Sequence, residues 1–79
     1  MKRAEIVQTL GLCWDSITVK RDGSVVAKRS FFYTFGGTVE TYKKRVLEAF
    51  PMATILAAYE HWAEWPDDSY WYVRFTTGE

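Results

Sequence analysis

The sequence predicts a small α+β domain with the element order α-β-β-α-β-β, in which a four-stranded, mainly antiparallel sheet carries a helix on one face. Three patterns predict this fold. Residues 70–76 alternate between apolar and polar side chains, as in a strand with one buried face. Residues 38–50 repeat apolar side chains at helical spacing behind a threonine. An Asp-Gly turn at residues 22–23 joins two further alternating segments.

The chain has 79 residues, 48% of them hydrophobic and 18% aromatic, which predicts one folded domain over residues 1–79. A domain of this size has a core that only just outweighs chain entropy. Cys13 is the one cysteine and His61 the one histidine, so the sequence has neither a disulfide framework nor a zinc pattern. We find no apolar stretch of the length that a membrane span or a signal peptide needs, and we expect a cytoplasmic protein.

The net charge is zero, but the charges are unevenly distributed along the chain. Residues 1–45 hold nine Lys/Arg and four Asp/Glu, a balance of +5, whereas residues 46–79 hold one Lys/Arg and six Asp/Glu, a balance of −5. Whether these charges also separate in space depends on the fold, because antiparallel pairing can interleave the two halves.

Residues 2–10 predict a short helix with its apolar side chains on one side and Gly11 as its stop. We expect this helix to cover an edge of the sheet or part of its second face, near Phe32.

The first hairpin is expected to join strands at residues 15–21 and 24–35. A three-residue turn sets Ile17 opposite Ala27 and Asp15 opposite Arg29, which keeps apolar side chains together and pairs opposite charges. A two-residue turn would instead place Lys28 beside the core. We therefore favour the three-residue turn.

Residues 38–50 give the strongest local prediction, a helix capped by Thr38 and ended by Pro51. This helix packs on one face of the sheet through an apolar stripe formed by Val39, Tyr42, Val46, Ala49 and Phe50. The third strand is expected over residues 52–65, a length that requires a bulge or bend. A turn at 65–69 then leads into the last strand, 70–76.

An unusual concentration of aromatic residues lies near the end of the chain, formed by Tyr59, Trp62, Trp65, Tyr70, Trp71 and Tyr72. Alternation assigns Trp71, with Val73 and Phe75, to the core, and Tyr70, Tyr72 and Arg74 to the opposite face. Tyr59 and Trp62 are three residues apart, so a regular strand places them on opposite faces. These rings exceed what one short hairpin can bury, which indicates a second surface.

Three local patterns resemble chemical sites only weakly. His61 is flanked by Glu60 and Glu64, but in a strand it points away from both, and even in a helix a third ligand is lacking. Cys13 has no base near it in sequence and is expected to be a small buried hydrophobe. The segment 36–38 precedes a helix but lacks the lysine of a phosphate-binding loop. We therefore predict no catalytic residue, metal ligand or cofactor.

The preferred functional hypothesis is a small non-enzymatic interaction module that binds a partner protein, or a second copy of itself, through an aromatic, acidic-rimmed sheet face. Compact chains of this kind are common among accessory and inhibitor proteins of phages and mobile elements, although no motif here identifies such a family. The expected partner-binding residues are Tyr59, Trp62, Trp65, Tyr70, Tyr72 and Arg74.

The alternative is a nucleic-acid-binding domain that uses the basic hairpin and helix, through Lys28, Arg29, Lys43, Lys44 and Arg45. A zero net charge weighs against it, because dedicated nucleic-acid binders usually carry excess positive charge. A third hypothesis, an enzyme or small-ligand protein, has no pair of groups at a working spacing to support it.

Overall fold

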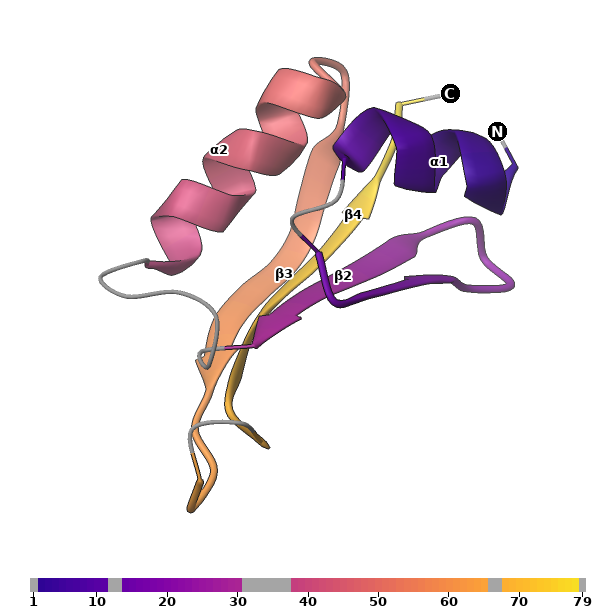
Figure 1. The fold of residues 1–79 in the computed structure, drawn as a ribbon. Helices are drawn as coiled ribbons and strands as arrows, with labels where there is room; N and C mark the ends of the chain where they lie inside the picture. The colour runs from indigo at the N-terminus through magenta and orange to yellow at the C-terminus, as the bar shows by residue number, and fades with distance from the viewer. Residues whose placement is uncertain (1, 12–13, 31–37, 66–67, 79) are drawn as a thin grey trace.

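The element order agrees with the prediction, and both helices lie on the same face of the sheet (Figure 1). The computed structural model describes residues 2–11, 14–30, 38–65 and 68–78. Its elements are α1 (Arg3–Leu10), β1 (Ser16–Val19), β2 (Val25–Ser30), α2 (Val39–Ala49), β3 (Thr54–His61) and β4 (Tyr70–Thr76).

The four strands are arranged in the order β1-β2-β4-β3, and every neighbouring pair is antiparallel. β2 and β3 are therefore parallel to each other on either side of β4, and α2 connects them across one face. The last strand is inserted between two earlier ones. This order brings the final hairpin against the first, so residues from both halves of the chain share each face of the sheet.

The first hairpin has the predicted register. Ile17 pairs with Ala27, and the Arg29 Nη1 atom donates to Asp15 Oδ1 at 3.1 Å. The turn places Gly23 at a φ of +88°, a backbone angle that residues with a Cβ rarely adopt. Charge pairing and apolar pairing thus selected the correct turn length. β1 itself is shorter than predicted, and of the predicted strand 24–35 the last five residues lie outside the described part.

The helix α2 begins and ends where its caps predict. The backbone N–H of Thr41 donates to the Thr38 side-chain oxygen at 3.4 Å, and Phe50 closes the last turn before Pro51. Tyr42, Val46 and Phe50 are buried, as the stripe predicted, and Val39 and Ala49 pack against the same core. This helix therefore lies on the predicted face.

The helix α1 packs beside α2 rather than over the second face of the sheet. Its side chains Ile6 and Leu10 join the same buried cluster as Tyr42 and Val46, and the Arg3 side chain donates to the Ile17 carbonyl at 3.3 Å. Of the two expected positions, the edge of the sheet is supported, because α1 contacts the edge strand β1 through Arg3. The expected cover of part of the second face is wrong, because Ile6 and Leu10 join the core on the face that carries α2. The second face is left without a described helix.

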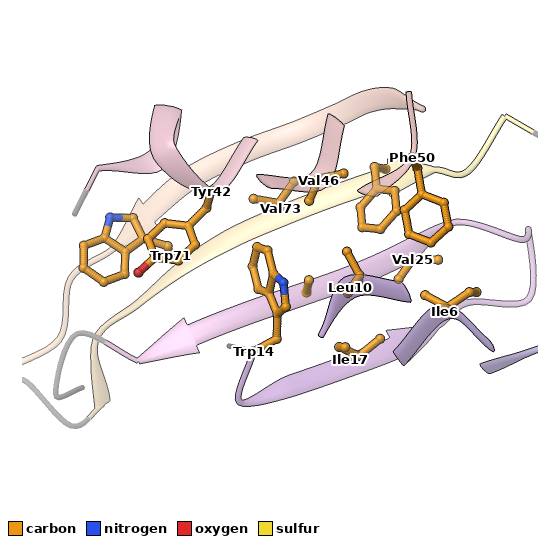
Figure 2. Packing of buried hydrophobic residues seen from close by; sticks show 12 residues of the cluster. Ile6, Leu10, Trp14, Ile17, Val25, Tyr42, Val46, Phe50, Trp71 and Val73 are labelled. Atoms are coloured by element: carbon orange, nitrogen blue, oxygen red, sulfur yellow. The ribbon is translucent and has the colours of Figure 1, made fainter. Parts of the chain in front are cut away.

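The core fills the space between the helices and one face of the sheet (Figure 2). At one end the Tyr42 ring lies between two indoles. It stacks on Trp71 with ring centroids 4.9 Å apart and meets Trp14 edge-on at 5.5 Å. At the other end Phe50 packs against Phe75 at 5.8 Å. The rings of α2 thus hold the helix to β4 at both ends.

The second hairpin differs from the prediction at its third strand. β4 covers the predicted residues 70–76, but β3 runs from Thr54 to His61 and not over the predicted 52–65. The expected irregularity is present between Ile55 and Ala57. Beyond His61 the hairpin continues past the ends of both helices (Figure 1), consistent with principal extents of 36 × 21 × 21 Å.

Candidate functional site

Polar and aromatic side chains occupy the face of the sheet that is turned away from the helices, here called the open face. Trp71, Val73 and Phe75 point into the core, so the alternate residues of β4 point the other way, as predicted. Their cross-strand neighbours on β2 and β3 share that side. The open face is defined by Lys28, Tyr59, His61, Tyr70, Tyr72 and Arg74.

The rings of the open face are stacked in cross-strand pairs. Tyr59 and Tyr72 lie with centroids 4.5 Å apart and planes at 17°, and His61 and Tyr70 lie at 4.6 Å and 16°. The Lys28 ammonium sits 4.9 Å from the centroid of the Tyr70 ring, within the range of a cation–π contact. The result is a layer of rings across β3 and β4 that ends at a positive charge on β2.

Tyr59 is the most accessible tyrosine of this layer, with 45% of its surface exposed on the edge strand β3. Partial desolvation raises the pKa of its phenol above the ordinary value, and the negative charges that Tyr72 and Tyr70 acquire on ionisation raise it further. Tyr59 is therefore neutral at physiological pH. It contributes an uncharged ring to the face.

The opposite end of the open face holds an ion pair. Arg74 Nη2 lies 2.6 Å from Asp22 Oδ2, and Arg74 Nε donates to Ser24 Oγ at 3.0 Å. The side-chain and backbone hydrogen bonds from Ser24, with the charge of Arg74, lower the pKa of Asp22. These contacts hold the Arg74 side chain against the β1–β2 turn, and the Asp22 carboxylate offsets most of its positive charge.

The tip of the β3–β4 hairpin displays two tryptophans to solvent. Trp62 is 71% exposed and Trp65 is 62% exposed. The turn beneath them is braced by Ser69, which is 2% exposed. Its Oγ accepts from the Ala63 N–H at 2.9 Å and lies 3.2 Å from the Trp65 carbonyl oxygen. The two indoles are thus carried on a hydrogen-bonded scaffold.

The described acidic residues of the second hairpin, Glu60, Glu64 and Asp68, lie near its tip. Glu60 pairs with Trp71 in the β3–β4 register, so it is on the helix side, where it accepts from Trp62 Nε1 at 3.2 Å. Glu64 and Asp68 are exposed beside the turn. The strand register turns Glu60 away from the tyrosines, so this residue does not rim the aromatic sheet face. Asp67 lies outside the described residues.

The predicted partner-binding residues form two surfaces instead of one. Tyr59, Tyr70, Tyr72 and Arg74 share the open face, as alternation indicated, whereas Trp62 and Trp65 lie beyond the end of β3. The rule that places Tyr59 and Trp62 on opposite faces does not apply, because the strand ends at His61.

The five basic residues of the nucleic-acid alternative do not form one surface either. Lys28 lies on the open face, but Arg29 points to the helix side and pairs with Asp15. The other three, Lys43, Lys44 and Arg45, are on α2, on the helix side of the sheet. Lys43 pairs with Glu40 at 3.3 Å, Arg45 lies 5.2 Å from the Tyr42 ring centroid, and Lys44 is exposed. The proposed set is therefore divided between two faces.

Of the weaker candidates, His61 lies in the described part of the chain, and its neighbour there is an aromatic ring. His61 stacks on Tyr70, and no group of three His, Cys, Asp or Glu side chains close enough to hold a metal ion occurs in residues 2–11, 14–30, 38–65 and 68–78. Cys13 and the glycines at 36 and 37 lie outside the described residues. No helix in the described part is long and apolar enough to cross a membrane.

Sequence reasoning missed two features of these surfaces. Lys28 and His61 belong to the open face only because β2 and β3 both flank β4, and the sequence does not specify that strand order. Ser69 was counted as one residue of a turn. Its position in a turn directly before an alternating strand, where serine side chains often hydrogen-bond the backbone, was the available signal for a bracing role.

Comparison with known proteins gives no assignment: no protein-family description, curated protein or solved structure matches this chain.

Proposed function

We propose that this protein is a non-enzymatic interaction module that docks on a partner protein through the tip of its β3–β4 hairpin. The outward display of Trp62 and Trp65 on a turn braced by Ser69 carries this proposal. Tryptophan is the residue most enriched at binding hot spots. The hydrogen bonds of Ser69 to the Ala63 and Trp65 backbone restrain the residues that carry the indoles, so less conformational entropy is lost on binding and more of the contact energy remains as affinity.

The placement of these indoles is costly for an unbound domain of this size. Each tryptophan ring can remove on the order of 150–250 Å² from water when it is buried. A chain of 79 residues has a small core, yet two of its four tryptophans lie outside it. A partner surface with a pocket for each ring would recover this area.

The charges near the tip indicate the charge expected on the partner surface. Glu60, Glu64 and Asp68 are exposed around the two indoles, and Trp62 Nε1 donates to Glu60. A partner with basic residues around an apolar pocket is complementary to this arrangement, and such charges mainly speed and orient association. This binding mode suits an accessory or inhibitor protein, which acts by occupying a surface of a larger partner.

The partner is a different protein rather than a second copy. Ser30 pairs with Tyr70 near the hairpin tip, whereas Val25 pairs with Phe75 beside the basic β1–β2 turn, so the tip and this turn lie at opposite ends of the sheet (Figure 1). A tip-to-turn contact between copies is head-to-tail and adds subunits in a line or ring. Binding to a separate protein instead forms a closed complex, to which no further copies of this chain are added.

Capture experiments from the native host with the wild-type protein and with the double substitution Trp62→Ser/Trp65→Ser test the proposal. We expect the wild type to retain one protein that the double variant loses. The captured protein, once purified, should bind the wild type with a dissociation constant at least tenfold lower than that for the double variant, because two hot-spot side chains are removed.

Met52→Ser is the matched control, since Met52 is 76% exposed but lies at the far end of β3 from the tip. It should bind as the wild type does. Equal retention by the double variant, or equal loss in the Met52 variant, contradicts docking through the tip. Near-ultraviolet circular dichroism of all three proteins separates loss of binding from loss of folding.

A further inference from the structure

The open face has the composition of a surface that binds single strands. We propose that it binds single-stranded nucleic acid, with bases stacked on its rings and phosphates held by Lys28. This surface is distinct from the hairpin tip, and the proposal does not depend on the tip binding a protein. It also differs from the basic hairpin and helix predicted from the sequence, because it uses a single face of the sheet.

The first argument is the arrangement of the rings. Tyr59–Tyr72 and His61–Tyr70 are stacked pairs two residues apart along the strands, which corresponds to a spacing of roughly 6.6 Å. Because the two rings of each pair already stack on each other across the strands, a base would stack on the outer face of a pair at the edge strand β3, where Tyr59 is 45% exposed. Aromatic platforms on sheets bind single strands in this way, largely without regard to sequence.

The second argument is charge. Among the described residues of the open face, the Lys28 ammonium contacts the Tyr70 ring rather than a carboxylate, and Asp22 is the acidic group, already held by Arg74 at 2.6 Å and by Ser24. Tyr59 adds no negative charge at physiological pH, because it is a phenol whose pKa lies above the ordinary value of 10.0. A negatively charged strand therefore meets a face with a positive balance, even though the whole chain has a net charge of zero.

The same charges disfavour a second copy on this face. Two open faces packed against each other would place the Lys28 charges of both copies in one interface, with Asp22 already engaged by Arg74. Like charges across an interface are unfavourable. The exposed groups are also rings with polar ends rather than aliphatic side chains, which favours stacking with bases over the apolar packing of a homodimer.

Fluorescence anisotropy with labelled oligothymidylate and oligouridylate of about ten nucleotides tests this proposal and compares DNA with RNA. We expect binding at about 50 mM salt that weakens as salt rises. Tyr59→Leu should weaken it about fivefold or more, because a ring is lost, whereas Tyr59→Phe should keep it within twofold. Lys28→Gln should reduce the slope of log K against log salt by about 0.7, the value for one phosphate contact to a single strand.

Lys44→Gln is the matched control, because Lys44 is an exposed lysine on α2, on the other side of the sheet. It removes the same charge and should leave both affinity and slope unchanged. Absence of binding at low salt, equal effects of the Lys28 and Lys44 substitutions, or equal loss with Tyr59→Phe and Tyr59→Leu each overturns the proposal. Tighter binding of polyglutamate than of either oligonucleotide also overturns it and assigns the face to an acidic protein.

Discussion

The raised pKa of Tyr59 makes the stability of the folded protein depend on pH in the alkaline range. Its ring is partly desolvated and faces Tyr72 at 4.5 Å, and these two conditions favour the neutral phenol. Because the pKa is raised in the folded protein, the neutral phenol stabilises the fold fully below the unfolded pKa near 10.0, and this contribution is lost as pH rises through the folded pKa. We expect Tyr59 to titrate above 10.0, as measured by NMR of ring-labelled tyrosine.

Substitution at the neighbouring ring tests the cause of this shift. Tyr59→Phe identifies the Tyr59 resonance by its disappearance. Tyr72→Phe keeps the stacked ring but removes a group that becomes negative at alkaline pH, so it should move the Tyr59 midpoint downward without restoring the ordinary value. A Tyr59 midpoint at or below the ordinary tyrosine value, or one that rises in the Tyr72 variant, would be inconsistent with this explanation.

At the scale of the elements, the turn of the β3–β4 hairpin depends on one buried hydroxyl. Ser69 Oγ accepts from Ala63 N–H at 2.9 Å. Ser69→Ala leaves this N–H without its acceptor in a part-buried turn, which should cost about 1–3 kcal/mol. Because the loss is local, amide exchange should accelerate at Ala63 and neighbouring tip residues more than at Val46 in α2. Hydrogen exchange measured by NMR provides both readouts.

Ser16→Ala is the control for this substitution, since Ser16 is an exposed serine on β1. It should change the free energy of unfolding by less than about 0.5 kcal/mol. If Ser69→Ala behaves like Ser16→Ala, the hydroxyl does not brace the turn, and the preorganised display of Trp62 and Trp65 loses its structural basis.

Comparison of the predicted and observed elements shows which structural features local sequence patterns determine. Local patterns predicted β4 residue for residue, and the pairing of Asp15 with Arg29 identified the register of the first hairpin. Both depend on neighbours along the chain or across one short turn. The end of β3 at His61 was not predicted, because Trp62 and Trp65 have side chains typical of strands but lie in the turn region.

The positions of α1 and of the acidic residues needed information from distant parts of the chain. α1 lies beside α2 because Ile6 and Leu10 fit the core there, a choice set by packing between elements. Glu60 is separated from the tyrosines because it pairs opposite Trp71. The aromatic composition indicated correctly that some rings lie outside the core, but only the register divides them into an open face and a hairpin tip.

At the scale of the whole molecule, both helices lie on one face of the sheet, where the described residues form one buried cluster, and no described helix lies on the other face. All buried side chains of the core cluster lie between the helices and the sheet. The surfaces proposed for binding are outside this cluster, so substitutions there should leave the fold largely intact. Substitutions within the cluster should instead affect the entire chain, because a domain of this size has no second core to compensate.

Tyr42 is the strongest test of this dependence, because its ring joins α2 to Trp71 of β4 and to Trp14 before β1, and it is 2% exposed. Tyr42→Ala should lower the free energy of unfolding by about 3–5 kcal/mol. That loss is a large part of the roughly 4–12 kcal/mol expected for a domain of this length. Tyr42→Phe keeps the ring contacts and should cost less than about 1.5 kcal/mol. Urea denaturation followed by circular dichroism measures these differences, and a loss in Tyr42→Ala no larger than that in Tyr42→Phe would show that the stacked rings do not hold the two layers together.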